Sequence, residues 1–197
     1  EMQQGFLKNR SMMKNLVDID MEAMCVSLRA ERGAIILFDF RAAFPSISHR
    51  FLLQTLRKIG LPESAVNAVT LLYDGNRCKI SCKGGTYKGF DSTAGVRQGC
   101  PLSPLLFVAV VDTLLRRLQL SSPSGTVRAF ADDIAMVLEC ASEKMGELQK
   151  IFGDFAEISG LELNMPKTVL IPLWQQSAEG IAQELAEAAP EWRSMKK

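Results

Sequence analysis

Apolar positions in the first part of the chain recur with two different periods. Between residues 12 and 31, apolar side chains such as Leu16, Ile19 and Val26 return at helical spacing with polar residues between them. Residues 33–40, Gly-Ala-Ile-Ile-Leu-Phe-Asp-Phe, are almost all apolar, which is typical of a short strand buried on both faces. The pattern therefore predicts a helix followed by a buried strand.

Start and stop signals predict the elements that come next. Ser46 or Ser48 can cap a helix that runs to about residue 59, and Pro62 opens another helix that runs to Tyr73.

Two glycines and a serine mark the middle of the chain. Gly84 and Gly85 separate short runs at 77–82 and 86–90, and they favour a hairpin because both residues can take positive φ. A long apolar helix is expected after this hairpin, capped by Ser103.

The second half repeats the alternation of strands and helices. Residues 127–139 predict a hairpin, Ser142 can cap the helix that follows, and Gly160 can end it. A last strand is expected at 168–173, and an alanine- and glutamate-rich helix at 178–189. This order is that of a split βαβ, ferredoxin-like antiparallel sheet packed on helices, so the expected fold class is α+β. In this topology the first strand lies beside the second hairpin.

Composition is that of one globular unit without a global basic field. The chain has 197 residues, 47% of them hydrophobic, which is enough to bury a core. Lysine and arginine number 23 against 22 acids, so net charge alone does not indicate a nucleic-acid partner. Basic residues do gather in two stretches, for which local basic faces and ordinary solvated surface are both open: Arg41, Arg50, Arg57 and Lys58, and Arg77, Lys79, Lys83 and Lys88.

Other features narrow the class of protein. The five cysteines contain no C-x-x-C pair, so neither a disulfide framework nor a zinc site is indicated. Without a long apolar run or a signal-peptide pattern, we expect an intracellular protein, nuclear or cytoplasmic, with no membrane partner. His49 is the only histidine, which weakens any hydrolase interpretation based on a Ser-His-Asp or Cys-His site.

Asp132 and Asp133 stand side by side in the predicted second hairpin, in the sequence Phe-Ala-Asp-Asp-Ile-Ala-Met-Val. Two adjacent carboxylates among apolar residues repel each other and lose hydration, so their burial is costly unless a cation compensates. A divalent metal is the simplest such cation. The alternative is an ordinary hairpin turn, because aspartate favours turns.

Asp39 is a third carboxylate, at the end of an apolar strand where packing gives no reason for an acid. It is poorly placed as a helix cap, because Pro45 and Ser46 mark the next helix start several residues later. If its strand neighbours the second hairpin, three carboxylates meet at one edge of the sheet. Such oxygen ligands suit Mg²⁺ before Zn²⁺, and two ions can clamp the attacking and leaving oxygens of a phosphoryl transfer.

The segment 94–104, Ala-Gly-Val-Arg-Gln-Gly-Cys-Pro-Leu-Ser-Pro, precedes the long apolar helix. Its glycines allow close approach of the backbone to a ligand, and the positive end of the helix suits anionic or polar groups. Gln98 can hydrogen-bond a base, a sugar or a phosphate. The alternative is a rigid turn that leads into a buried helix.

Ordered motifs carry a family resemblance over nearly the whole chain. Residues 37–44 contain Asp followed by Ala-Phe, 95–104 read Gly-x-x-Gln-Gly-x-Pro-x-Ser-Pro, and 130–133 read aromatic-x-Asp-Asp. Residues 160–168 read Gly-Leu-x-x-Asn-x-x-Lys-Thr, and 5–11 are similar to the end of a fingers motif. Together these segments resemble reverse transcriptases, in particular those of non-LTR retrotransposons and, more distantly, of group II introns.

The resemblance implies a polymerase palm with part of the fingers, and it implies roles for individual residues. Asp39, Asp132 and Asp133 would be catalytic and, with Phe40, would hold two Mg²⁺ ions, for which Mn²⁺ could substitute. Phe44 would stand under the sugar of the incoming dNTP and exclude a 2′-hydroxyl by its bulk. The other residues implied in substrate binding are Phe40, Arg41, Ala42, Ala43, Arg97, Gln98, Gly99 and, at the pyrophosphate, Lys167.

The implied activity is RNA-directed DNA synthesis, with an RNA template, a DNA or RNA primer and dNTPs as partners. The implied division is partial fingers at 1–32, palm at 33–44 and 91–173, a helical and hairpin insertion at 45–90, and a helical tail at 174–197. Further basic fingers residues are expected before Glu1, and the primer grip and thumb after Lys197. Processive synthesis by the chain alone is therefore not expected.

Two other interpretations remain open. A catalytically silent reverse-transcriptase-like domain could serve as a nucleic-acid or protein scaffold, but a scaffold has no physical reason to keep clustered, unpaired acids. A nucleotide cyclase or another enzyme with a similar sheet would share the metal chemistry, but it would not require the segment 95–104 or Phe44.

Overall fold

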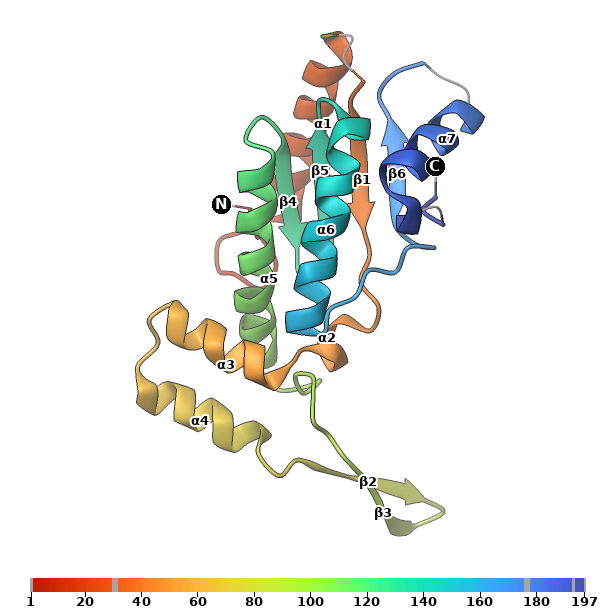
Figure 1. Ribbon diagram of the computed structural model, residues 1–197. Coiled ribbons are helices and arrows are strands. Elements are labelled where there is room, and N and C mark those ends of the chain that lie inside the picture. The colour runs from red at the N-terminus through yellow and green to blue at the C-terminus, as the bar shows by residue number, and fades with distance from the viewer. Residues whose placement is uncertain (1, 30–31, 176–177, 193, 197) are drawn as a thin grey trace.

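The computed structural model describes residues 2–29, 32–175, 178–192 and 194–196. Figure 1 shows a sheet covered by helices, from which a separate hairpin projects. The elements are α1 (Met12–Leu28), β1 (Ala34–Phe38), α2 (Ala43–Ser46), α3 (His49–Lys58), α4 (Glu63–Tyr73), β2 (Arg77–Cys82), β3 (Gly85–Asp91), α5 (Ser103–Ser121), β4 (Thr126–Phe130), β5 (Asp133–Leu138), α6 (Ala141–Ser159), β6 (Val169–Pro172), α7 (Ala178–Ala188) and a 3-10 turn at Pro190–Trp192.

The main sheet has the predicted ferredoxin-like order. Its four strands run β4-β5-β1-β6, and every neighbouring pair is antiparallel. The first strand therefore lies beside the β4–β5 hairpin, and the α+β fold class is confirmed. In the register between them, Phe38 lies opposite Ile134, and across the hairpin Phe130 lies opposite Asp133.

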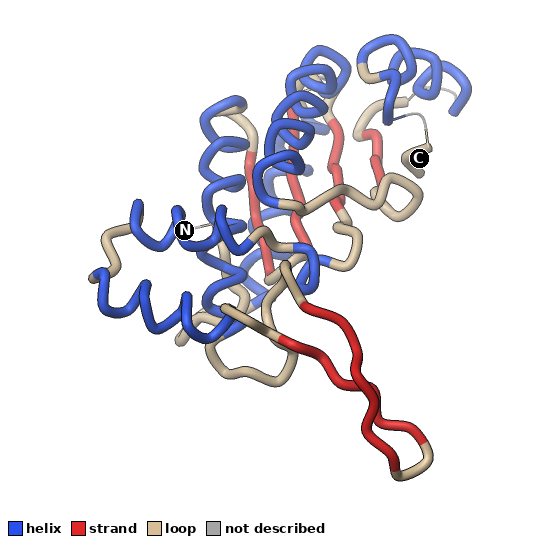
Figure 2. Tube along the Cα trace, turned by 60° about the horizontal axis from the view of Figure 1, so that its bottom comes forward, coloured by secondary structure: helices blue, strands red, loops and turns tan. Residues whose placement is uncertain are grey.

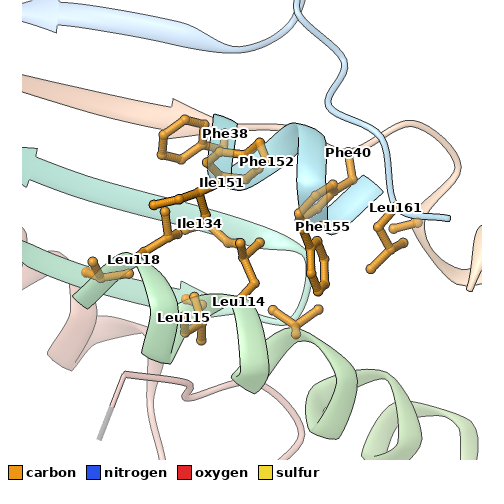
Figure 3. Close-up of a cluster of buried hydrophobic side chains, with 14 of the residues drawn as sticks. Phe38, Phe40, Leu114, Leu115, Leu118, Ile134, Ile151, Phe152, Phe155 and Leu161 are labelled. Atoms are coloured by element: carbon orange, nitrogen blue, oxygen red, sulfur yellow. The ribbon is translucent and has the colours of Figure 1, made fainter. Parts of the chain in front are cut away.

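One face of the sheet packs on α5 and α6 to form the core (Figure 3). Phe38 from β1 meets Phe152 from α6 with ring centroids 4.5 Å apart, and Leu114 and Leu115 of α5 are almost fully buried. Burial of these large side chains supplies most of the driving force for folding. Both the helices and the strands therefore contribute side chains to this core.

The other face of the sheet is covered by α1 mainly over β4 and β5 (Figure 1). Beyond α1, Leu37 of β1 keeps 40% of its surface exposed and Ile171 of β6 keeps 41%. The prediction that the first strand is buried on both faces was therefore wrong for this face. Alternate residues of β1 meet the helical core, and those between them face an open apolar surface.

Helix and turn positions agree with the sequence more closely than their capping chemistry does. Ser48 caps α3 as expected, accepting a hydrogen bond from the amide of Phe51 at 3.3 Å. Ser103 does not cap α5, because it lies inside the first turn with its side chain 99% buried, and its hydroxyl is 3.5 Å from that of Tyr73. Ser142 likewise lies inside α6 and does not cap it.

The projecting hairpin also turns one residue earlier than predicted. Positive φ occurs at Lys83 and Gly84, and Gly85 already belongs to β3. Within the described ranges, no helix is both long enough and apolar enough to cross a membrane.

Candidate active site

Strand register brings the three aspartates to one end of the main sheet. Asp39 directly follows β1, and Asp133 begins β5. Since Phe38 is paired with Ile134 in antiparallel register, the next pair of positions is Asp39 and Asp133. Asp132 lies in the two-residue turn between β4 and β5, so carboxylates more than ninety residues apart in sequence become neighbours.

The three carboxyl groups differ in exposure and influence one another. Asp39 and Asp132 are half-buried, whereas Asp133 is exposed rather than enclosed among apolar residues as the sequence suggested. Partial desolvation, followed by the negative charges of Asp132 and Asp39, raises the pKa of Asp133 above its ordinary value. The charge of Asp39 therefore acts on Asp133 across the strand pair.

This repulsion makes a prediction for stability against pH. Because the pKa of Asp133 is higher in the folded than in the unfolded protein, folding favours its protonated form. The contribution of this carboxyl to the stability of the fold is therefore fully present below its unfolded pKa and is lost as pH rises through its folded pKa. We expect Asp133→Asn to raise the melting temperature at pH 7, and the gain to shrink as pH falls towards 4. Asp20→Asn, at an exposed position on α1, is the control. A gain that is the same at both pH values would contradict the repulsion.

The chemistry of the three carboxylates suits a divalent cation, although in their present conformations these side chains are not close enough together to coordinate one. Oδ2 of Asp39 is buried and has no hydrogen-bond partner among the described residues. An ionised oxygen without a partner is costly in a protein, and a hard cation would satisfy it while relieving the repulsion around Asp133. Within the described part of the chain, no three His, Cys, Asp or Glu side chains gather closely enough to hold an ion, so binding requires side-chain rotation.

Gln3 holds the turn that carries Asp132. It is 2% exposed, and its Nε2 donates to the carbonyl of Ala131 at 3.1 Å while its Oε1 accepts from the amide of Ala131 at 2.9 Å. Ala131 has φ 58, a left-handed conformation that alanine rarely adopts. Gly5 lies so close to this turn that a Cβ there would be 2.2 Å from the nitrogen of Ala131. Gln3 and Gly5 therefore clamp a strained turn onto the sheet.

Sequence reasoning missed Gln3. The only available signal was its position just before the segment 5–11, which resembles a fingers motif and begins at Gly5. Glutamine is usually a surface residue, so nothing in the local pattern marked this one as buried.

The clamp predicts a measurable cost for removing the amide. Gln3→Met keeps the side-chain length but leaves the amide and carbonyl of Ala131 without their partner, which costs about 1–3 kcal/mol per buried group. We expect the free energy of unfolding, measured by urea denaturation, to fall by at least about 2 kcal/mol. Gln54→Met, at an exposed position on α3, should leave it nearly unchanged. Equal unfolding free energies for both variants would show that the clamp does not stabilise the turn.

Asp39 is positioned by the fourth motif, residues 160–168. The amide of Asn164 donates to the carbonyl of Asp39 at 2.7 Å, and the amide of Asp39 donates to Oγ1 of Thr168 at 3.4 Å. Thr168 is fully buried, whereas Lys167 beside it is exposed. The asparagine and threonine of this motif thus fix the backbone that presents the carboxylate, and the lysine remains free to reach a ligand.

A small pocket lies between residues of the segments 37–44 and 95–104. Its volume is about 280 Å³, and its lining includes Phe6, Phe44, Arg97, Gln98 and Gly99. The rings of Phe44 and Phe107 stack with centroids 4.5 Å apart and planes 3° from parallel, while Phe6 meets Phe44 edge-on at 6.3 Å. The structure therefore places Phe44 and the segment that contains Gln98 around one pocket. The ring of Phe107 supports the ring of Phe44 there.

The backbone around this pocket is shaped by left-handed residues. Ala42, at φ 42, precedes the short helix α2 that begins at Ala43, and the amide of Val96 donates to the carbonyl of Phe44 at 2.8 Å. At Gly95, φ is 86 and a Cβ would lie 2.5 Å from the carbonyl oxygen of Pro45, so only glycine fits.

Two further residues of the predicted set, Phe40 and Arg41, are also placed, and so is the lone histidine. Phe40 is buried against Phe152 and pairs with Leu163. Arg41 is exposed, with Nη1 4.0 Å from the carboxylate of Glu162. His49, the lone histidine, has Nε2 2.8 Å from the carbonyl of Gly95, so its role is to hold the loop.

Comparisons with known proteins show what the chain is similar to. A family model described as reverse transcriptase (RNA-dependent DNA polymerase) matches residues 1–182. The chain is 33% identical over 171 residues to a retrovirus-related Pol polyprotein from the type-2 retrotransposable element R2DM of Drosophila melanogaster. It is 34% identical over 147 residues to a Pol polyprotein from a type-1 retrotransposable element R2 of Popillia japonica. These alignments cover 84% and 70% of the chain, respectively.

A solved structure of telomerase from Candida tropicalis, in complex with a fragment of telomeric RNA, shares the fold with a TM-score of 0.66 at 13% identity. This match covers 81% of the chain. The chain spans only 16% of the fly relative, 20% of the beetle relative and 29% of the telomerase chain.

Proposed function

The chain belongs to the reverse transcriptase family, and we propose that it is the palm, with part of the fingers, of an RNA-directed DNA polymerase of the non-LTR retrotransposon type. The single observation that supports this most strongly is the register that brings Asp39 beside Asp133 and the turn carrying Asp132. Three acids at one sheet end, one of them with a buried oxygen that has no hydrogen-bond partner among the described residues, form an anionic site suited to divalent cations.

In the proposed reaction, a primer 3′-hydroxyl attacks the α-phosphorus of a dNTP chosen by an RNA template, and pyrophosphate leaves. Asp39, Asp132 and Asp133 would hold two Mg²⁺ ions, or Mn²⁺ in their place, together with Phe40, whose only oxygen is its main-chain carbonyl. When bound, the ions would lower the pKa of the attacking hydroxyl and neutralise charge on the transferring phosphoryl group.

The proposed contacts with the nucleotide and the template would come from residues of the pocket and of the segments 37–44 and 160–168. Phe44, supported by Phe107, would contact the sugar of the dNTP. Gln98 would contact the nucleotide and template. The other proposed contacts, mostly with the triphosphate, come from Arg41, Ala42, Ala43, Arg97, Gly99 and, at the leaving pyrophosphate, Lys167.

The domain division carries over to this proposal. The palm, at 33–44 and 91–173, would contain all three acids. The insertion at 45–90 would carry most of the projecting hairpin, and residues 1–32 would form part of the fingers. Residues 2–5 and α1 pack on the palm sheet, which supports their acting together with it. The five free cysteines fit a reducing nuclear or cytoplasmic setting for this activity.

The proposal is tested by joining the chain to the flanking segments of its parent reading frame and supplying Mg²⁺, a primed RNA template and dNTPs. We expect extension whose sequence follows the template, which stops when the next required dNTP is omitted and when EDTA is added. A silent scaffold would bind the primed template without extending it, and that result would overturn the proposal. Substituting Mn²⁺ should restore extension after EDTA and dialysis.

A further inference from the structure

The β2–β3 hairpin stands away from the body of the protein. Figures 1 and 2 show it projecting as an arm beyond α4 and the loop that follows β3. Each of its strands packs mainly against the other, in register from Arg77 opposite Asp91 to Cys82 opposite Gly85. Because an isolated two-stranded hairpin is marginally stable in water, contact with a binding partner would stabilise such an arm.

Charge on the arm identifies the chemistry of that partner. Lys79 lies directly opposite Lys88 on one face, both are exposed, and Lys83 occupies the turn with φ 48. Like charges directly opposite in a hairpin destabilise it. In the described part of the chain the only ion pair on the arm joins Arg77 to Asp91 at 3.5 Å, which leaves the three lysines uncompensated. A polyanion would convert this repulsion into attraction.

Large apolar side chains are interleaved with these cations. Ile80 lies opposite Tyr87 on the face away from the lysine pair, and they are 53% and 59% exposed. Phe90, near the base of the arm where the strand register shifts by one residue, is 65% exposed. Exposed rings next to lysines are the features with which proteins bind single-stranded nucleic acid, since rings stack on unpaired bases and lysines contact phosphates.

The base of the arm is connected to the pocket that contains Gln98. Asn76, directly before β2, accepts a hydrogen bond from Nη2 of Arg97 through its Oδ1 at 2.7 Å. Arg97 also lies over the ring of Tyr73 at the end of α4, 6.0 Å from the centroid. A strand held at the base of the arm would therefore lie near Arg97, which lines the pocket that contains Gln98.

We propose that the β2–β3 arm is a binding site for single-stranded RNA, with Lys79, Lys88 and Lys83 on its phosphates and Tyr87 and Phe90 on its bases. The inference deepens the proposed function, on which it rests for the choice of RNA, because it gives the template a second point of attachment outside the catalytic end of the sheet. Binding itself needs no metal, dNTP or primer, so it can be measured apart from synthesis.

The test is fluorescence anisotropy of a labelled single-stranded 20-nucleotide RNA with the 197-residue chain over a range of KCl concentrations, without metal or dNTP. We expect the double variant Lys79→Gln/Lys88→Gln to bind about ten-fold more weakly at 0.1 M KCl and to lower the slope of log K against log[KCl] by about 1.4, since each phosphate contact contributes about 0.7. The control Lys58→Gln/Lys150→Gln removes the same charge from exposed positions on α3 and α6. For this control we expect an affinity within about two-fold of the wild type and a salt slope within about 0.3 of the wild-type slope.

Tyr87→Ala separates stacking from charge. We expect its affinity to fall about ten-fold with an unchanged salt slope, because stacking on bases releases no counterions. Thermal melts monitor folding, and Lys79→Gln/Lys88→Gln should melt no lower than the wild type because it removes a like-charge pair. Weaker RNA binding by a variant that is at least as stable cannot be attributed to unfolding.

Equal losses in the arm and control variants, or an unchanged slope for Lys79→Gln/Lys88→Gln, would overturn the proposal and leave the arm as a contact for protein. The outcome is distinguishable from that of the polymerase assignment. Template-directed extension with unaltered RNA binding by the arm variants would refute the arm alone. Arm-dependent binding by a protein that never extends a primer would refute the polymerase function and retain the arm.

Discussion

Asp132→Asn is expected to lower the rate of primer extension about 100- to 1000-fold in the chain joined to its flanking segments. Asparagine keeps the size of the side chain and its place in the turn that Gln3 holds, but it removes the negative charge that would hold a divalent cation. Metal stabilisation of a phosphoryl-transfer transition state is worth several kcal/mol, and each 1.4 kcal/mol corresponds to about a factor of ten in rate. The measurement is single-turnover extension of a primed RNA at saturating Mg²⁺.

The control for this loss is a second aspartate on the same protein. Asp20→Asn changes net charge equally at an exposed position of α1 and should extend primers at the wild-type rate. Because removing Asp132 also relieves repulsion on Asp133, the variant should melt no lower than the wild type. Extension by Asp132→Asn at the rate of Asp20→Asn would show that the three acids are not the catalytic site.

Phe44→Val is expected to reduce discrimination between dNTPs and rNTPs by about 100-fold, mainly by raising kcat/KM for rNTPs. The ring of Phe44 stacks flat on Phe107 and touches Phe6 edge-on, so it cannot move aside to admit a larger sugar. Valine leaves space in the pocket shared with Gln98, in which a 2′-hydroxyl could be accommodated. The measurement is the ratio of kcat/KM values for one dNTP and the matching rNTP opposite the same template base.

Loss of packing alone must be separated from loss of discrimination. Phe51→Val removes a half-buried ring on α3 that meets Phe155 edge-on at 5.8 Å, outside the pocket. It should lower stability by a similar amount and leave the ratio unchanged. If Phe51→Val and Phe44→Val alter the ratio equally, Phe44 does not contact the sugar.

Much of the fold was predictable because it is encoded by local periodicity and by signals at element ends. Gly160 ends α6 in a left-handed conformation at φ 78, as its place after an amphipathic run predicted. The pairing of β1 with the second hairpin followed from the order of strands and helices, since connection rules leave few alternatives for such a chain. The predicted caps at Ser103 and Ser142 failed because serine near a helix start can also be buried inside the first turn.

The chemistry of the candidate site was partly encoded in the sequence in the same way. An acid at the end of an apolar strand and a pair of acids in a hairpin are local anomalies, so Asp39, Asp132 and Asp133 could be identified without coordinates. Their exposure could not be identified, because it depends on which neighbours cover the sheet end. Asp133 is exposed, and the sequence placed it among buried residues.

The sequence by itself determined the order of elements and the identity of the acidic residues, because both depend on periods and signals within about twenty residues. The order of elements in turn predicted the antiparallel sheet through the rules of strand connection. Only the tertiary structure decided that Gln3 clamps the turn of Ala131 and that Asn164 and Thr168 hold the backbone of Asp39. These contacts join residues more than one hundred positions apart. Their partners are main-chain groups, which every residue possesses, and so no side-chain pattern in the sequence records them.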